Sequence, residues 1–169
     1  MKLRYVILPL ALALSLPAMA ANTAKPATRG FEVRDMAYMD RYSSPTLSPD
    51  GRVLVFAKRV VNKDTNKSST SLWMRNLATR DNAPPKQVSP DGWNVNSPAF
   101  STDGQSLYFL SGKSGSMQLY SIALNGGEAR QLTDFALDVD GYKLSPDGKQ
   151  VALASAVFPE CKAALTCTK

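Results

Sequence analysis

The sequence predicts an all-β fold, a partial β-propeller of about two blades and the start of a third. One turn motif occurs three times, and the segments between its copies repeat the same order of apolar strands and polar loops. The repeat also has the length of a propeller blade. Because propellers close with about four to eight blades, we expect this chain to be the N-terminal fragment of a longer chain.

The turn motif opens each repeat. Its copies are Ser48-Pro49-Asp50-Gly51, Ser101-Thr102-Asp103-Gly104 and Ser145-Pro146-Asp147-Gly148. Proline presets φ at the second position of a β-turn, aspartate tolerates the third, and glycine supplies the left-handed φ of a bulged hairpin loop. We therefore interpret the three aspartates as turn residues. The alternative is a metal-binding or catalytic role for them.

The first twenty residues are predicted to be a signal peptide, which separates residues 1–20 from the folded chain. Lys2 and Arg4 precede an apolar run over 6–16 that is short for a bilayer, and Ala18-Met19-Ala20 has the small-x-small pattern of a cleavage site. Cleavage after Ala20 leaves 149 of the 169 residues. The alternative, an uncleaved anchor helix, is disfavoured by two prolines in the stretch. We expect a periplasmic or secreted product with no membrane anchor after cleavage.

The charge of the chain excludes one class of partner. The formal net charge is +6, and it falls to +4 once Lys2 and Arg4 are removed. The basic residues are interleaved with polar and acidic ones, as on a solvated surface. We therefore expect no nucleic-acid binding.

Residues 21–41 are predicted to form an N-terminal leader or arm. Residues 21–29 are small and polar, as in a flexible leader. Val33, Met36 and Met39 follow roughly one helical face, so a short helix or a packed arm is expected between Phe31 and Tyr42.

The incomplete propeller is predicted over 42–169. Its parts are blade 1 at about 45–89, blade 2 at about 98–133 and the start of blade 3 at about 142–169. The expected strands lie at 52–61, 70–77 and 86–89 in blade 1, and at 107–111, 117–124 and 129–133 in blade 2.

The register between the repeats supports this division. Gln87 precedes Phe100 by thirteen residues, and Gln131 precedes Leu144 by the same interval, while Trp73 aligns with Tyr120. Ser89-Pro-Asp-Gly92 has the letters of the motif, but counting it as a repeat start would break this interval. We interpret it as a turn between blades.

The residue types for common catalytic sites are missing. There is no histidine, no Gly-x-Ser-x-Gly elbow and no Gly-x-x-x-x-Gly-Lys-Ser/Thr loop. We assign no catalytic, cofactor-binding or metal-binding residue and expect no cofactor. Asp134, Asp138 and Asp140 loosely suggest a calcium loop without its distal glutamate, so an exposed acidic loop between blades is preferred. The strand aromatics are expected in the core between blades: Phe56, Trp73, Phe100, Tyr108, Phe109 and Tyr120.

The two cysteines are Cys161 and Cys167. Export favours a local disulfide between them. Free thiols or a bridge to a partner outside this chain are the alternatives, and zinc is disfavoured because two cysteines without histidine leave a tetrahedral site half empty.

The sequence resembles known propellers. The motif openings, Leu119-Tyr-Ser-Ile122, Gln131-Leu-Thr133 and the signal peptide resemble the repeats of TolB-like proteins. The chain looks still more like the N-terminal propeller of secreted prolyl oligopeptidase-family serine peptidases, in the dipeptidyl/acylaminoacyl peptidase branch. Residues 137–148, 157–161 and 167–169 favour the peptidases, and the resemblance covers about 31–169.

The resemblance implies a function for a longer protein. In those peptidases the propeller caps an α/β-hydrolase domain that follows in the same chain, restricts access to peptides and can help to hold the substrate N-terminus. Their catalytic Ser, Asp and His lie downstream, and no position of this sequence matches them. We therefore expect the gating propeller of an exported peptidase, with a peptide substrate and a hydrolase domain in cis as partners. The alternatives are a non-enzymatic TolB-like binding or scaffold module and a degraded or truncated copy.

Overall fold

The computed structural model describes residues 29–79 and 83–158. The chain divides into two units, 1–31 and 32–169, and the description below concerns the second. Within the described residues there are one short helix and ten strands in three antiparallel sheets. No helix in this part of the chain is long and apolar enough to cross a membrane. The predicted signal peptide, Cys161 and Cys167 lie outside the described residues.

Helix α1 (Val33–Tyr38) lies within the segment where the sequence suggested a short helix or arm. Glu32 begins it, and the Glu32 backbone N–H donates to the Asp35 carboxylate at 2.9 Å. The apolar side chains that suggested a helical face are exposed, Val33 by 80% and Met36 by 54%. The spacing of these apolar residues therefore matches the helix that forms, but no described residues bury their side chains.

Blade 1 is a four-stranded sheet in the order β1-β2-β3-β4. Its strands are β1 (Arg41–Leu47), β2 (Val53–Val61), β3 (Ser68–Asn76) and β4 (Lys86–Gln87). The short outer strand pairs Gln87 with Trp73.

Blade 2 repeats this arrangement, and blade 3 begins it. The strands of blade 2 are β5 (Val95–Phe100), β6 (Ser106–Ser111), β7 (Gln118–Ala123) and β8 (Arg130–Gln131), again in chain order. Gln131 pairs with Tyr120, as Gln87 pairs with Trp73 in blade 1, so the aligned residues of the two blades have equivalent partners. Strands β9 (Gly141–Leu144) and β10 (Val151–Ala154) form the third sheet.

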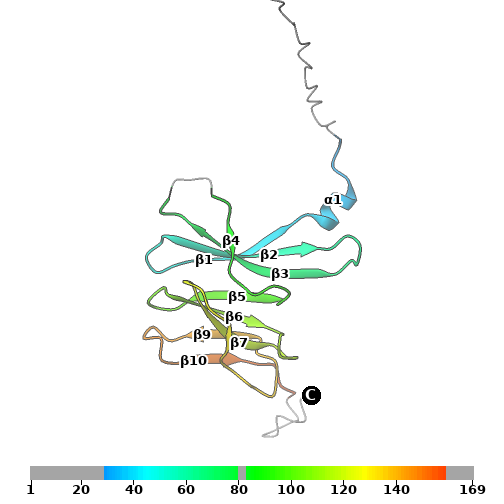
Figure 1. The fold of residues 1–169 in the computed structure, drawn as a ribbon. Coiled ribbons are helices and arrows are strands. Elements are labelled where there is room, and N and C mark those ends of the chain that lie inside the picture. The colour runs from blue at the N-terminus through cyan, green and yellow to red at the C-terminus, as the bar shows by residue number, and fades with distance from the viewer. Residues whose placement is uncertain (1–28, 80–82, 159–169) are drawn as a thin grey trace, which may run out of the picture. The chain divides into compact units, whose positions relative to one another are not determined.

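The three sheets follow one another in chain order as stacked blades (Figure 1). The predicted fold class, an all-β partial propeller, is confirmed.

Blades 1 and 2 share one apolar core. Val55, Ala57 and Leu72 of blade 1 are at most 2% exposed and belong to the same cluster as the buried residues of blade 2. Those residues are Val95, Leu107, Phe109, Tyr120 and Ile122. Because each sheet alternates its side chains between two faces, one face of blade 1 covers one face of blade 2.

Most of the predicted core aromatics lie between blades. Tyr120 stacks on Phe109 at 6.0 Å between ring centroids and meets Trp93 edge-on at 5.1 Å. Phe100 packs against the first core, and Tyr108 packs against a second, smaller core between blades 2 and 3 around Leu110, Leu119 and Val139. Phe56 and Trp73 differ from the expectation. Phe56 contacts Tyr42 at 5.6 Å, and Trp73 contacts the Lys58 ammonium at 5.3 Å.

Candidate functional site

Each repeated turn is closed by its serine and its aspartate. In blade 2 the Ser101 hydroxyl donates to Asp103 Oδ1 at 2.5 Å, and the same carboxylate oxygen accepts the Gln105 backbone N–H at 3.0 Å. Ser101 Oγ also accepts the Ser106 backbone N–H at 2.9 Å. The turns of blades 1 and 3 make the same bonds at distances of 2.6 to 3.1 Å. Each carboxylate therefore binds within its own turn.

These bonds also set the charge of the turns. The serine hydroxyl and then the backbone N–H lower the pKa of Asp50, Asp103 and Asp147 below the usual aspartate value. The three carboxylates are exposed, ionised at neutral pH and carried by three different blades. The structure thus gives each of them a turn role. Asp50 also has the Arg52 guanidinium nearby, with Arg52 Nε 3.9 Å from Asp50 Oδ2.

The glycine of the motif has two structural roles. Its φ is +69° in all three turns, the left-handed region that favours glycine. A Cβ on Gly104 would lie 3.2 Å from Pro49 Cδ, and a Cβ on Gly148 would lie 3.1 Å from Thr102 Oγ1. The turn of one blade therefore packs on the glycine of the next, whereas a Cβ on Gly51 would meet no described atom within 4 Å.

The acidic segment after blade 2 holds neighbouring backbone. Asp138 Oδ1 accepts the Met117 N–H at 2.6 Å, as Asn94 Oδ1 accepts the Thr70 N–H at 3.0 Å one repeat earlier. Asp140 Oδ2 accepts the Ala156 N–H at 2.8 Å. In the part of the chain that the structure describes, no three His, Cys, Asp or Glu side chains gather as a metal site would require.

Gln118 ties blade 2 to the connection that leads to blade 3. Its side chain is buried, and its Oε1 accepts the Thr133 hydroxyl at 2.8 Å and the Phe135 N–H at 3.0 Å. Its Nε2 donates to the Phe135 carbonyl at 3.0 Å and the Leu137 carbonyl at 3.3 Å. The sequence did not lead us to expect a role for Gln118. The available signal was a polar side chain that alternates onto the buried face of a strand.

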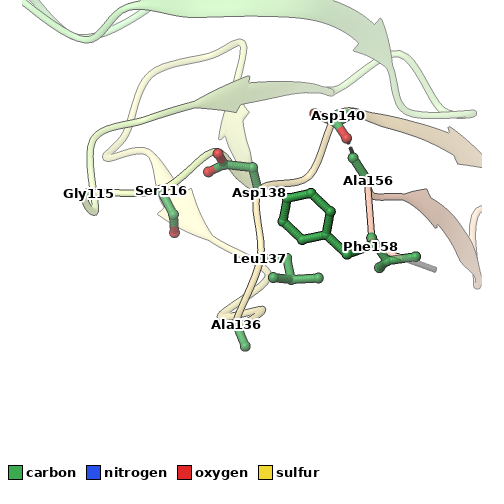
Figure 2. Close-up of a pocket in the computed structure, with 9 residues that line it drawn as sticks. Gly115, Ser116, Ala136, Leu137, Asp138, Asp140, Ala156 and Phe158 are labelled. Atoms are coloured by element: carbon green, nitrogen blue, oxygen red, sulfur yellow. Dashed lines mark hydrogen bonds between the residues drawn. The ribbon is translucent and has the colours of Figure 1, made fainter. Parts of the chain in front are cut away.

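The connection held by Gln118 borders a hollow of about 520 Å³. Its walls are Gly115 and Ser116 from the β6–β7 loop, residues 136–138 and 140 from the connection, and residues 156–158 after β10. Figure 2 shows the Phe158 ring in the middle of this lining and the Asp140–Ala156 bond beside it. The site combines apolar walls with two carboxylates, and each carboxylate keeps one oxygen to which no described residue donates.

The described lining of the hollow consists of apolar side chains, Ser116 and two carboxylates. Its side chains offer apolar contact and negative charge, and the chain has no histidine to act as a general base. Chemically the arrangement can bind a cationic group next to an apolar one. It cannot by itself perform acyl transfer by a Ser-His-Asp mechanism.

The chain is similar in sequence to peptidases. It is 31% identical over 121 residues to "Uncharacterized peptidase YuxL" of Bacillus subtilis, a match that covers 69% of this chain and 18% of that protein. It is 35% identical over 113 residues to "Dipeptidyl-peptidase 5" of Porphyromonas gingivalis, covering 67% of this chain and 16% of the relative. The chain thus spans less than a fifth of the length of these two relatives. No protein-family model matches it.

Solved structures support the fold. The β-propeller domain of the Trilobed protease from Pyrococcus furiosus matches with a TM-score of 0.52 at 15% identity, over 68% of this chain and 33% of that one. A putative TolB from Agrobacterium tumefaciens matches with a TM-score of 0.52 at 22% identity, over 65% and 36% of the two chains. The resemblance inferred from the sequence, to peptidase propellers with TolB-like repeats, is confirmed.

Proposed function

We propose that this chain is the N-terminal substrate-gating propeller part of an exported serine peptidase of the prolyl oligopeptidase family, acting on peptides as an aminopeptidase or dipeptidyl peptidase does. The observation that carries the proposal is the similarity to two peptidases over less than a fifth of their length. The chain supplies propeller blades and no histidine, so we assign hydrolysis to an α/β-hydrolase domain that follows in cis. Catalysis belongs to that domain.

The outward face of blade 1 supports a larger ring. Leu54 and Phe56 are the repeat equivalents of Leu107 and Phe109, which are fully buried under blade 1. In blade 1 they are half-buried and line an apolar hollow of about 420 Å³ together with Tyr42. A further blade on this face would bury them as blade 1 buries their equivalents, and a complete ring would restrict which peptides reach the hydrolase.

The hollow beside Gln118 is suited to one end of a peptide substrate. A free peptide N-terminus is an ammonium group close to a side chain. The hollow offers, beside Leu137 and Phe158, one oxygen each of Asp138 and Asp140 to which no described residue donates. Opposite charge at close range stabilises a bound ammonium group. We assign to this hollow a role in holding the substrate's amino end.

Export completes the proposal. The charged start, apolar run and small-x-small pattern of residues 1–20 are those of a cleaved signal peptide. We infer a periplasmic or secreted location for the mature protein.

A second candidate function is a periplasmic binding or scaffold module that presents a propeller face to protein partners. The likeness to the Agrobacterium TolB structure favours it, because that match is as good in TM-score as the match to the Trilobed protease propeller. In that case ring closure would be followed by no hydrolase domain.

Sequencing the transcript beyond the codon for Lys169 separates the two functions. The peptidase proposal expects several further blades, then a Gly-x-Ser-x-Gly elbow and a later histidine. A stop codon soon after enough blades to close a ring would overturn it and support the binding module.

A further inference from the structure

The first strand of each blade has one edge without a partner strand. Strand β1 pairs only with β2, β5 only with β6, and β9 only with β10 among the described residues. In a propeller the first strands line the central channel. A free strand edge exposes backbone N–H and C=O groups that can pair with another extended chain.

Blades 1 and 2 block this edge in the same way. Ser44 and Ser97 have a left-handed φ of +51°, and the pairing register shifts across each of them. Pro45 and Pro98 follow directly, and proline has no N–H to donate. Bulges and prolines are devices by which natural sheets prevent edge pairing.

Blade 3 lacks the proline and the left-handed residue. The equivalent residues are Gly141 and Tyr142, which lie 44 residues after Ser97 and Pro98. Within β9 the register with β10 is continuous from Gly141–Ala154 to Leu144–Val151. The register shift of blade 3 lies just before the strand, where the Asp140 N–H donates to the Ala154 carbonyl at 2.9 Å. The backbone of Gly141 does not have a positive φ.

The free groups on β9 can be assigned from the hairpin. The Ser145 N–H donates to the Gln150 carbonyl at 2.9 Å, and in an antiparallel pair the backbone groups of alternate residues point toward the partner strand. The backbone groups of Tyr142 and Leu144 therefore point away from β10. Strand β9 pairs with no other strand among the described residues, so neither N–H has a strand partner there.

This edge is held in place and has space beside it. The Tyr142 hydroxyl donates to the Ser97 carbonyl at 2.7 Å, and burial raises the pKa of Tyr142, so the phenol stays a donor. A hollow of about 510 Å³ lies next to this strand, and its lining comes from residues 97–102 of blade 2 and residues 142–146 of blade 3.

We propose that the inner edge of β9 binds an extended peptide by strand addition, through the backbone groups of Tyr142 and Leu144. The inference deepens the proposed function, since a propeller that gates peptides would meet them in its channel. It commits to main-chain pairing, the mode in which backbone hydrogen bonds supply affinity. It needs no hydrolysis, so its test is independent of a downstream active site.

The test is a titration of the isotope-labelled 169-residue chain with the capped pentapeptide acetyl-Thr-Val-Glu-Val-Thr-amide, followed by the NMR amide signals. Binding should shift the Tyr142 and Leu144 amides saturably. Two N-methylated peptides serve as probes, one methylated at both valines and one at the other three residues. In an extended peptide alternate N–H groups point to opposite edges, so each methylated peptide lacks the N–H donors of one edge. One of them should bind at least tenfold more weakly, and the other should bind like the parent.

Two variants extend the test to the protein. Tyr142→Pro places at this position the residue that blades 1 and 2 carry and should abolish the shifts. Tyr142→Phe keeps the N–H, loses only the bond to Ser97, and should still bind. Equal binding of the two N-methylated peptides, shifts confined to the β10 amides, or no shifts at all would each overturn the proposal, even if Tyr142→Pro failed to fold.

Discussion

A serine hydroxyl and an aspartate carboxylate close each of the three repeated turns. Proline, aspartate and glycine in the sequence predict the turns, and the positive φ of all three glycines agrees with this prediction. The bonds of Ser101 to both Asp103 and the Ser106 N–H were not predicted. These bonds depend on how close the ends of the two strands lie in the folded chain, and the order of residues in the sequence does not give that distance.

The glycines of the motif offer a matched pair of substitutions. Gly51→Ala should lower the free energy of unfolding by about 1 kcal/mol, because alanine is strained at a left-handed φ. Gly104→Ala should lower it further, because the added Cβ would lie 3.2 Å from Pro49 Cδ. Urea unfolding measures both changes. Adding Pro49→Ala to Gly104→Ala should recover the excess, and equal effects of the two glycine substitutions would contradict the packing of one turn on the next.

The turn aspartates predict a dependence of stability on pH. The folded-state pKa of Asp103 is lowered, chiefly by the Ser101 hydroxyl. A carboxylate whose pKa is lower in the folded state than in the unfolded state stabilises the fold at pH values above its unfolded pKa of about 3.9. This stabilisation is lost as the pH falls through the folded-state pKa. Asp103→Asn should therefore be less stable than the wild type at pH 7, and the difference should shrink as the pH falls below about 4.

The thermal unfolding midpoint, measured between pH 7 and pH 2.5, checks this dependence. Asp64→Asn is the matched control, because the structure shows no bond to that carboxylate from any described residue. A difference between Asp103→Asn and the wild type that stays constant down to pH 2.5 would refute the assignment.

At the scale of the elements, the strands were easier to predict than the segments between them. The apolar stretches located β2, β3, β6 and β7 to within two residues at every end. The bulges at Ser44 and Ser97 were not predicted, because a left-handed serine follows from how the first strand must bend and not from serine's own preference. The role of Gln118 was missed for a similar reason, since its partners lie 15 to 19 residues away.

Gln118→Ala should test whether its hydrogen bonds hold the connection to blade 3. The substitution leaves the part-buried Phe135 N–H and the buried Leu137 carbonyl without their partner, and the loss of a partner by a buried group costs about 1–3 kcal/mol. The free energy of unfolding should fall by at least about 2 kcal/mol. Gln105→Ala, at an exposed position in the turn of blade 2, is the control and should change it little. Similar effects of the two substitutions would show that the bonds of Gln118 add no stability.

At the scale of the whole molecule, the described blades depend on one another. The core of blade 1 is completed by Leu107 and Phe109 of blade 2, so neither sheet buries its apolar face alone. The repeat register predicted this stacking. The sequence could not predict that Leu54 and Phe56 would line an apolar hollow, because the same residue types are buried one repeat later.

Leu72→Ala should destabilise both blades together. Leu72 is fully buried in the shared core, and such truncations cost about 2–5 kcal/mol. Amide hydrogen exchange should accelerate in β6 and β7 as well as in β2 and β3. The control is Leu77→Ala, whose side chain is 44% exposed. Faster exchange confined to blade 1 would mean that the blades unfold independently.

The central claim is that these blades belong to a larger serine peptidase, and its most direct test is fluorophosphonate labelling of the protein made by the native cells. An antibody raised against residues 29–79 and the fluorophosphonate probe should detect the same exported band, at a mass several times the 18.3 kDa of this chain. A mature product of about the mass of this chain that is recognised by the antibody and not labelled by the probe would contradict the claim.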